Sequence, residues 1–407
     1  MSVAIIVDTF PRWSERFIAR ELNELARRGV AFSIYCLKAG DASCESDAEF
    51  SGLIERRVVL PACFVPSAAR ELGMDAAARA RKKRVEKELG LTAFRQIGCA
   101  NSLVKLIREH GHSIVYAHFA SLPSTLGWLA AVALELPLVV SAHARDVFVE
   151  AQLLSEKMKC ARRFFTCQSR AFFYLRETIE GLDPWVPSDE RDDAPSGKTV
   201  LMRHGLPLQA YPFQPRKERV AREFKLLAAG RFVRKKGFHD LIDALDGVEL
   251  EKAPVSLTLL GEGPEAKALS KRVAKLKLGA HVTMPGSVQG AELRKYFDEA
   301  DALVVPSVAA RDGDSDGVPN VVLEAMALGV PVIGTQAGSL GDVLREEGCD
   351  PTGVIFAPGD VTGLARAIRW VMKEQIAVSA RVANARKMIE SQFDVRRTIE
   401  PLARELA

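Results

Sequence analysis

The chain has 407 residues, of which 48% are hydrophobic and 27% are charged, and its formal net charge at pH 7 is +4. This length predicts two or three domains with substantial apolar cores. The charge lacks the basic excess of nucleic-acid-binding chains, so no nucleic acid is expected as a partner. The cysteines are odd in number and never spaced Cys-x-x-Cys, which favours reduced thiols of a cytosolic protein over a disulfide or zinc framework.

The apolar runs give no membrane-spanning or secretory signal. Val3–Val7 is short, has no basic lead and ends at Asp8. The longest apolar stretch, Leu126–Leu134, is far below the ~20 residues that a spanning helix needs. We therefore expect a cytoplasmic protein, either soluble or resting on the inner face of the membrane.

In chain order, short apolar runs alternate with amphipathic segments, as in parallel sheets covered by helices. Helices are expected at Glu15–Arg28 and Asn101–His110, and Ile179–Lys198, rich in Asp, Pro and Ser, is expected to be a loop near a domain junction. The predicted strands of the first half are Val3–Asp8, Ala31–Leu37, Arg57–Leu60, Ser113–His118, Leu138–Ala142, Phe164–Gln168 and Thr199–Met202.

The second half continues the alternation, and the part after Asp360 is expected to be mostly helical. Its predicted strands are Lys225–Ala229, Ser256–Leu260, Val282–Met284, Ala302–Val305, Val332–Gly334 and Val354–Phe356. The fold class is therefore α/β, with two doubly wound, Rossmann-like domains and a helical tail. Ligands are expected where the carboxyl ends of the strands face a cleft between the domains.

A basic loop follows the predicted strand Lys225–Ala229. Gly230 ends the strand, Arg231 and Lys236 lie in the loop, and helical spacing resumes at Gly237. Arginine, lysine and a helix N-terminus together can bind a diphosphate, although a solvated basic turn is the alternative.

Two carboxylates eight residues apart mark the segment from Asp316 to Gly329. Asp316 lies in a Gly/Asp-rich loop, Pro319 can open a helix, Glu324 lies about one turn further on, and Gly329 closes the helix. Carboxylates that face one site can accept hydrogen bonds from paired hydroxyls of a sugar. The alternative is an acidic loop followed by an ordinary packed helix.

Both segments together resemble the family-four glycosyltransferases, which are retaining enzymes of the GT-B fold. The family's Glu-x7-Glu motif appears as Asp316-x7-Glu324, and its Gly-Arg…Lys-Gly motif appears as Gly230-Arg231…Lys236-Gly237. The resemblance is strongest from about residue 199 onward. In the N-terminal half the chain is most similar to bacterial exopolysaccharide and colanic-acid-type members.

The resemblance implies a GT-B architecture with three parts. Residues 1–190 would form an acceptor-side Rossmann-like domain, residues 199–385 a nucleotide-sugar-binding Rossmann-like domain, and residues 386–407 a C-terminal helix packed back on the first domain. The partners implied are a nucleotide sugar donor and a saccharide or lipid-linked acceptor, in the biosynthesis of an exopolysaccharide, lipopolysaccharide or other glycan.

The resemblance also implies roles for individual residues. Arg231 and Lys236 would clamp the diphosphate, Glu324 would hold the ribose, and Asp316 would orient the donor hexose. The backbone at Gly230, Gly317, Val318 and Pro319 would complete the donor site. Asp316 replaces the usual first glutamate and is one methylene shorter, which leaves the identity of the donor sugar open.

Further candidates come from the first domain. His118 and His143 lie at or just past the ends of predicted strands, and a hydrogen-bonded structural histidine is the alternative for each. His143 matches a family histidine that touches the donor sugar or its phosphate and is assigned a catalytic role. The acceptor-side candidates are Ser14, Glu15, His118 and Asp146.

No metal or cofactor is expected, because Arg231 and Lys236 supply the positive charge that a metal would bring, and the nucleotide sugar is a substrate. Asp312-Gly-Asp314 imitates a metal-binding motif, but an EF-hand loop would need a carboxylate where Leu323 stands. Gly261-Glu-Gly263 lacks the third glycine of a dinucleotide fingerprint. A GT-B-like sugar-nucleotide epimerase and a non-catalytic sugar-nucleotide-binding protein remain the alternative functions.

A basic run on an expected helix of the first domain has two interpretations. It is either a solvated helix face or a contact with an anionic membrane surface or a pyrophosphate-linked lipid acceptor. Its members are Arg79, Arg81, Lys82, Lys83, Arg84 and Lys87.

Overall fold

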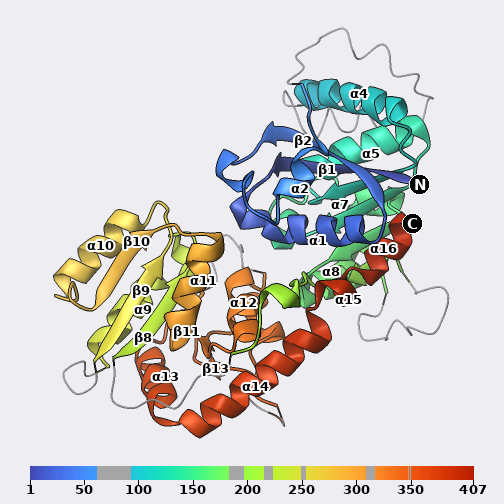
Figure 1. Ribbon diagram of the computed structural model, residues 1–407. Helices are drawn as coiled ribbons and strands as arrows, with labels where there is room; N and C mark the ends of the chain where they lie inside the picture. The colour runs from blue at the N-terminus through green and yellow to red at the C-terminus, as the bar shows by residue number, and fades with distance from the viewer. Residues whose placement is uncertain are drawn as a thin grey trace. The chain divides into compact units, whose positions relative to one another are not determined.

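The computed structural model describes residues 1–61, 93–182, 197–214, 223–248, 254–308, 317–346, 348 and 350–407. The chain forms two compact units. Met1–Gly205 and Val395–Ala407 form the first unit, and Leu206–Asp394 forms the second. Each unit contains one parallel sheet with helices on both faces (Figure 1). The predicted α/β class with two Rossmann-like domains is confirmed.

The first unit has a sheet with the strand order β3-β2-β1-β4-β5-β6-β7, in which every described pair is parallel. Each strand expected from the apolar pattern is present, with ends within two residues of the prediction. The strands are β1 (Ser2–Phe10), β2 (Ala31–Ala39), β3 (Arg57–Val59), β4 (Ile114–His118), β5 (Leu138–Ala142), β6 (Arg163–Thr166) and β7 (Thr199–Leu201).

Alternation along β1 gives this sheet two apolar faces. Val3, Ile5 and Val7 pack on the face covered by α1 (Arg16–Arg27), whereas Ala4 and Ile6 pack on the face covered by α5 (Leu122–Leu134). Both faces are buried, which explains why β1 is almost uniformly apolar. The other helices before the first crossing into the second unit are η1 (Trp13–Glu15), η2 (Ala42–Cys44), α2 (Ser51–Ile54), α4 (Ala93–Glu109), α6 (Ala144–Phe148), α7 (Leu154–Cys160), α8 (Ser169–Tyr174) and the π-helical η5 (Leu175–Glu180).

The last two helices, α15 (Val395–Thr398) and α16 (Glu400–Leu406), belong to the first unit. Ile399, Leu402 and Leu406 join the apolar cluster that contains the α1 side chains. Ion pairs reinforce this packing: Arg162 Nε lies 2.7 Å from Glu405 Oε2, and Arg163 Nε lies 2.8 Å from Glu405 Oε1. The C-terminal residues therefore complete the core of the N-terminal unit.

The second unit has a six-stranded parallel sheet with the order β10-β9-β8-β11-β12-β13. The order in both sheets reverses beside the first strand, between β1 and β4 and between β8 and β11. In open parallel sheets, ligands bind outside the carboxyl ends of strands at such a reversal. The strands are β8 (Phe224–Ala229), β9 (Val255–Leu260), β10 (Val282–Gly286), β11 (Ala302–Val305), β12 (Val332–Gly334) and β13 (Val354–Ile355).

Helices cover both faces of this second sheet. Leu226 and Ala228 of β8 share a core with α9, whereas Leu227 faces the cluster that contains α12. The mostly helical structure expected after Asp360 is present. The helices are η6 (Leu208–Ala210), η7 (Arg234–Lys236), α9 (Phe238–Asp246), α10 (Ala266–Lys275), α11 (Gly290–Glu299), α12 (Asn320–Leu328), η8 (Leu340–Asp342), α13 (Val361–Lys373) and α14 (Gln375–Gln392).

The unit boundaries differ from the predicted domain boundaries. Because β7 pairs with β6, the chain leaves the first unit only after Gly205, and residues 199–205 are not part of the second domain. Because α14 packs against α12, the chain returns to the first unit at Val395 and not at residue 386. The apolar pattern locates each strand but does not say which sheet a strand at the junction joins.

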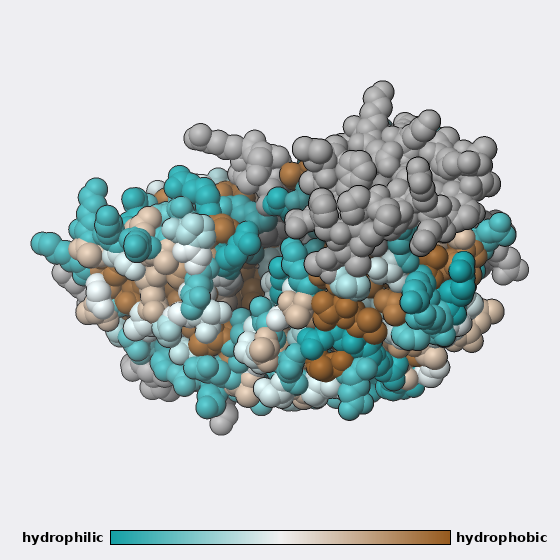
Figure 2. Space-filling model, turned by 90° about the horizontal axis from the view of Figure 1, so that it is seen from above, coloured by the Kyte–Doolittle hydropathy of each residue, from teal (hydrophilic) through white to brown (hydrophobic). Residues whose placement is uncertain are grey.

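Hydrophilic residues cover much of the described surface in the view of Figure 2, and apolar residues appear there in small groups. No helix in the described ranges is long and apolar enough to span a bilayer. The basic run from Arg79 to Lys87 lies outside the described residues, so its contact with a membrane stays a prediction.

Candidate functional site

The basic loop follows β8, beside the point where the second sheet reverses its order. Gly230 ends the strand with φ 155°, and a Cβ there would lie 3.4 Å from Cε of Lys236. The Lys236 side chain therefore lies over the end of β8. Arg231 is exposed, and its carbonyl oxygen accepts from the Val233 amide over 2.8 Å within the same loop. Gly230, Arg231 and Lys236 thus lie in one loop at the end of β8, and their role in binding a diphosphate stays a prediction.

Gly237 anchors this loop to the strand end across the reversal. It has φ 67°, and a Cβ would lie only 1.8 Å from the carbonyl oxygen of Pro306, which follows β11. The Val308 amide also donates to the carbonyl oxygen of Lys235 over 2.9 Å. Any larger residue at position 237 would push the basic loop away from β11, so glycine fixes the position of the loop.

The acidic segment leads into α12. Pro319 is the N-cap of this helix rather than part of its first turn, and Gly329 ends the helix with φ 82°. Glu324 is 5% exposed, and the Tyr211 hydroxyl donates to its Oε1 over 3.1 Å. Gly317, Val318 and Pro319 are partly exposed and precede the helix. Asp316 lies outside the described residues.

Tyr211 is a site candidate that the sequence did not reveal. Nη1 of Arg386 donates to the carbonyl oxygens of Tyr211, over 2.8 Å, and Ala327, over 2.6 Å. The guanidinium therefore holds the segment that carries Tyr211 beside the C-terminal turn of α12. Because Tyr211 lies 113 residues from Glu324, no local spacing pattern could have linked them.

In the first unit, four side chains with ligating atoms follow successive strand ends. His118 ends β4, His143 follows β5, Cys167 follows β6 and His204 lies three residues beyond β7. The predicted candidates His118 and His143 thus lie in one cluster, and their ring centroids are 6.3 Å apart. No local motif in the sequence points to Cys167 or His204.

A buried carboxylate from α1 holds part of this cluster. Oε1 of Glu21 lies 2.9 Å from Nδ1 of His204, and Oε2 lies 3.4 Å from Nε2 of His118. The Tyr116 hydroxyl also donates to Oε2 over 3.4 Å. Burial raises the pKa of Glu21 to about 7 and lowers the pKa of both His118 and His204 to about 3. Both imidazoles are therefore neutral at pH 7.

Phe17, one turn before Glu21 on α1, orders the imidazole rings. Its ring stacks on that of His204, with centroids 4.0 Å apart, and lies 5.0 Å from the centroid of His143. Burial lowers the pKa of His143 well below its ordinary value. Both ring nitrogens of His143 are buried and have no hydrogen-bond partner among the described residues. Local spacing gives no functional signal for Phe17 or Glu21, because both lie within the amphipathic helix α1.

The carboxylate of Asp146 is buried and binds backbone amides. Its Oδ1 accepts from the His143 amide over 2.7 Å, and its Oδ2 accepts from the Ala120 amide. Lys157 Nζ donates to the carbonyl oxygens of Ala120, over 2.6 Å, and Ser121, over 2.9 Å. Burial raises the pKa of Asp146 to about 7 and lowers that of Lys157 to about 7. Asp146 therefore ties the loop after β4 to the start of α6, where the sequence analysis expected an acceptor contact.

The two remaining acceptor-side candidates lie in η1, which follows β1. Ser14 is exposed. Glu15 is largely buried and lies 2.8 Å from Nη1 of Arg12, and its burial raises the pKa of its carboxyl group.

The second unit is similar in sequence to a known protein family. Residues 212–388 match the model of a family described as glycosyl transferases group 1. This range contains the basic loop, Glu324 and all six described strands of the second sheet. All of the matched residues lie within the second unit, Leu206–Asp394.

Individual relatives agree with this family. The chain is 27% identical over 213 residues to WcaL of Escherichia coli (strain K12), a protein whose name refers to a colanic acid biosynthesis glycosyltransferase, with 52% of each chain covered. It is 33% identical over 195 residues to a glycogen synthase of Mycobacterium tuberculosis, covering 48% of this chain and 45% of the relative. The chain spans about half the length of these curated relatives.

The whole fold is similar to a solved structure of HepE from Anabaena in complex with UDP. The TM-score is 0.71 at 19% identity, and the match covers 100% of this chain and 99% of that one. The predicted resemblance to GT-B glycosyltransferases of the exopolysaccharide type is confirmed.

Proposed function

We propose that the chain is a retaining glycosyltransferase that transfers a hexose from a nucleoside diphosphate sugar to a hydroxyl group of a saccharide or lipid-linked acceptor. The observation that carries the proposal is the basic loop at the reversal of the second sheet. Gly237 anchors it against Pro306, in the unit that matches the family model. Oriented cations at that position suit a leaving diphosphate.

In this proposal Arg231 and Lys236 bind the diphosphate and stabilise the negative charge that grows on it as the anomeric carbon–oxygen bond breaks. Charged donors held in place before the reaction stabilise such charge effectively. The N-terminus of α9 adds the positive end of its dipole. Glu324, oriented by Tyr211, accepts hydrogen bonds from the ribose hydroxyls.

Asp316, with the amides of Gly317 and Val318, orients the donor hexose. His143 acts on the donor sugar or its phosphate as a neutral hydrogen-bonding group, because its pKa lies well below neutral pH. In this mechanism no protein side chain attacks the anomeric carbon. The departing phosphate accepts the proton of the acceptor hydroxyl on the face where the new bond forms, so the anomeric configuration is retained.

UDP-glucose is the first donor to test, because HepE was solved in complex with UDP and with UDP-glucose. The similarity to WcaL suggests acceptors from exopolysaccharide biosynthesis. The predicted cytoplasmic location and membrane contact stay predictions.

The test is to incubate the protein with UDP-, GDP- and ADP-hexoses and to measure free nucleoside diphosphate with and without saccharide or lipid-linked acceptors. Acceptor-dependent release supports the proposal, and proton NMR of the first product should give an α-linkage from an α-linked donor. An isomerised sugar nucleotide would instead make the protein an epimerase. Thermal stabilisation by the donor without turnover would make it a binding protein.

A further inference from the structure

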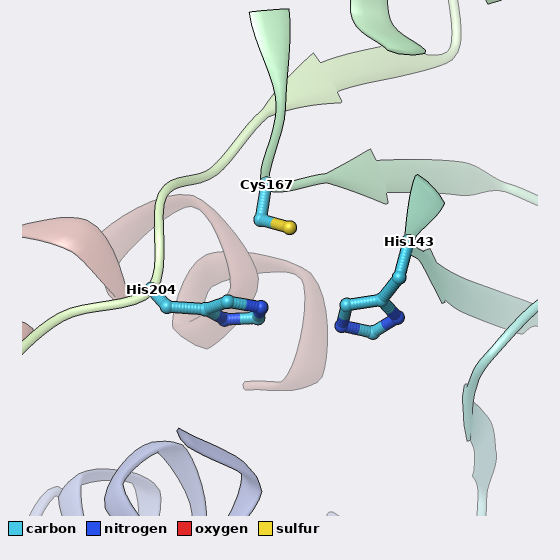
Figure 3. Close-up of side chains that lie close together, drawn as sticks. All are labelled: His143, Cys167 and His204. Atoms are coloured by element: carbon cyan, nitrogen blue, oxygen red, sulfur yellow. The ribbon is translucent and has the colours of Figure 1, made fainter. Parts of the chain in front are cut away.

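The carboxyl ends of β5, β6 and β7 bring two imidazoles and a thiol together in the first unit. One ligating atom each of His143, Cys167 and His204 lies within 4.8 Å of the others. In Figure 3 a ring nitrogen of His204 and one of His143 face each other, and Sγ of Cys167 lies above the gap between them. Intervals of 24 and 37 residues separate the three, so no short sequence motif contains them.

The ring nitrogens in this cluster are unusual for buried polar atoms. Nε2 of His204 and both ring nitrogens of His143 are buried without a hydrogen-bond partner in the described ranges. A buried polar atom without a partner destabilises the fold unless a ligand binds it. A metal ion would accept a lone pair from each of the two rings and so satisfy these buried nitrogens.

A second group of contacts resembles the outer shell of a metal site. Oε1 of Glu21 lies 2.9 Å from Nδ1 of His204, which fixes the ring so that Nε2 faces the cluster. A carboxylate that accepts from the far nitrogen of a ligating histidine both orients the ring and makes it a stronger ligand. Phe17 stacks on His204 and further limits rotation of the ring.

We propose that His143, Cys167 and His204 form a binding site for a divalent metal ion that favours nitrogen and thiolate ligands, and that Zn²⁺ is the ion that fits. Zinc takes two imidazoles and a thiolate, with bonds of about 2.0–2.1 Å to nitrogen and about 2.3 Å to sulfur. A tetrahedron with those bonds separates its ligand atoms by about 3.3–3.6 Å, so the three side chains close in by rotating about their side-chain bonds. The fourth position is left for water or another ligand.

This site is distinct from the diphosphate site, for which no metal is expected. It includes His143, which the proposed function assigns to the donor sugar, but metal binding can be measured without any nucleotide sugar. The two proposals can therefore fail independently.

Titration of the metal-free protein with Co²⁺ tests the site. We expect one equivalent to give the intense visible bands of tetrahedral cobalt and a near-ultraviolet band of thiolate-to-cobalt charge transfer, and Zn²⁺ to displace it. Cys167→Ser should abolish the charge-transfer band. Cys160→Ser, the same change at an exposed cysteine of the same unit, should leave it intact.

Glu21→Gln provides a second measurement that keeps all three ligands. Loss of an outer-shell carboxylate weakens metal affinity about 10–100-fold, and we expect this shift in the Zn²⁺ competition curve. Near-ultraviolet circular dichroism of each metal-free variant establishes that the fold is intact. Absence of the charge-transfer band in the wild type, or its persistence in a folded Cys167→Ser protein, would overturn the proposal.

Discussion

The hydroxyl of Tyr211 donates to Oε1 of Glu324 over 3.1 Å and so joins the segment after η6 to the buried face of α12. A carboxylate held in this way is oriented before any ligand arrives, which reduces the ordering that binding requires. The pair therefore separates two contributions to ribose binding, the charge of Glu324 and the direction in which the carboxylate points.

Glu324→Gln should weaken binding of UDP, because a hydrogen bond to a charged acceptor contributes about 1.5–3 kcal/mol, or roughly 10–150-fold in affinity. Tyr211→Phe removes only a neutral donor and should cost about 2–10-fold. Asp316→Asn should leave UDP binding intact and lower turnover or change the choice of sugar. Isothermal titration calorimetry measures the UDP affinity of all three variants, and the acceptor assay measures turnover. Equal losses of UDP affinity in Glu324→Gln and Asp316→Asn would refute this division of roles.

Arg231→Met and Lys236→Met should each lower kcat/KM by well over tenfold, because each removes a charge-assisted contact to the diphosphate. Arg234→Met is the matched control, since Arg234 is an exposed cation in the same loop. If kcat/KM fell by the same factor in all three variants, the loop would act only through its overall positive charge.

Transfer should proceed in the presence of EDTA, because cationic side chains take the place of a metal at the diphosphate. Zn²⁺ should inhibit, since the proposed zinc site recruits His143 away from the donor sugar, and Cys167→Ser should weaken this inhibition. Rates are measured in EDTA and then with Mn²⁺, Mg²⁺ or Zn²⁺ added in excess. Loss of activity in EDTA that only Mn²⁺ restored would contradict the metal-independent mechanism.

Asp146→Asn should destabilise the first unit by about 1–3 kcal/mol, because an amide group cannot accept from both the His143 and the Ala120 amides. Glu150→Gln is the control, since Glu150 pairs with Arg145 at the surface. Thermal unfolding measures both. If Asp146→Asn were as stable as wild type but had a raised KM for acceptor, the result would support the predicted acceptor contact of Asp146.

Glu21 should make stability depend on pH. Its pKa of about 7 in the folded state exceeds the value of 4.5 for an ordinary glutamate, so its contribution is present below pH 4.5 and is lost as the pH rises to 7. The side chain of Glu21→Gln does not ionise, so the stability of this variant does not fall over that pH range. The Tm of Glu21→Gln minus the Tm of wild type should therefore be larger at pH 8 than at pH 5. His118 and His204, whose pKa values are lowered to about 3, act in the opposite sense and lose their contribution as the pH falls from 6.5.

Scanning calorimetry of wild type and Glu21→Gln at the two pH values gives the comparison, because both proteins keep the histidines. A Tm difference between the two proteins that stayed constant with pH would mean that Glu21 ionises normally in the folded state.

The strands and the strand-end candidates followed from the sequence because burial of both sheet faces leaves nearly continuous apolar runs. Gly230 and Gly329 could be interpreted locally, since each ends a strand or a helix with a positive φ that favours glycine. Tyr211 and Glu21 could not, because their partners are distant in the chain and each looks ordinary among its neighbours. The same holds for β7, whose membership in the first sheet depends on pairing with β6.

The return of α15 and α16 to the first unit has a consequence for biosynthesis. A ribosome completes β1 to β7 long before it makes Ile399, Leu402 and Leu406, and the whole second unit is made in between. Until then the α1 face of the first sheet lacks part of its apolar cover. The second unit can finish folding during translation, whereas the first acquires its last core residues only when α16 leaves the exit tunnel.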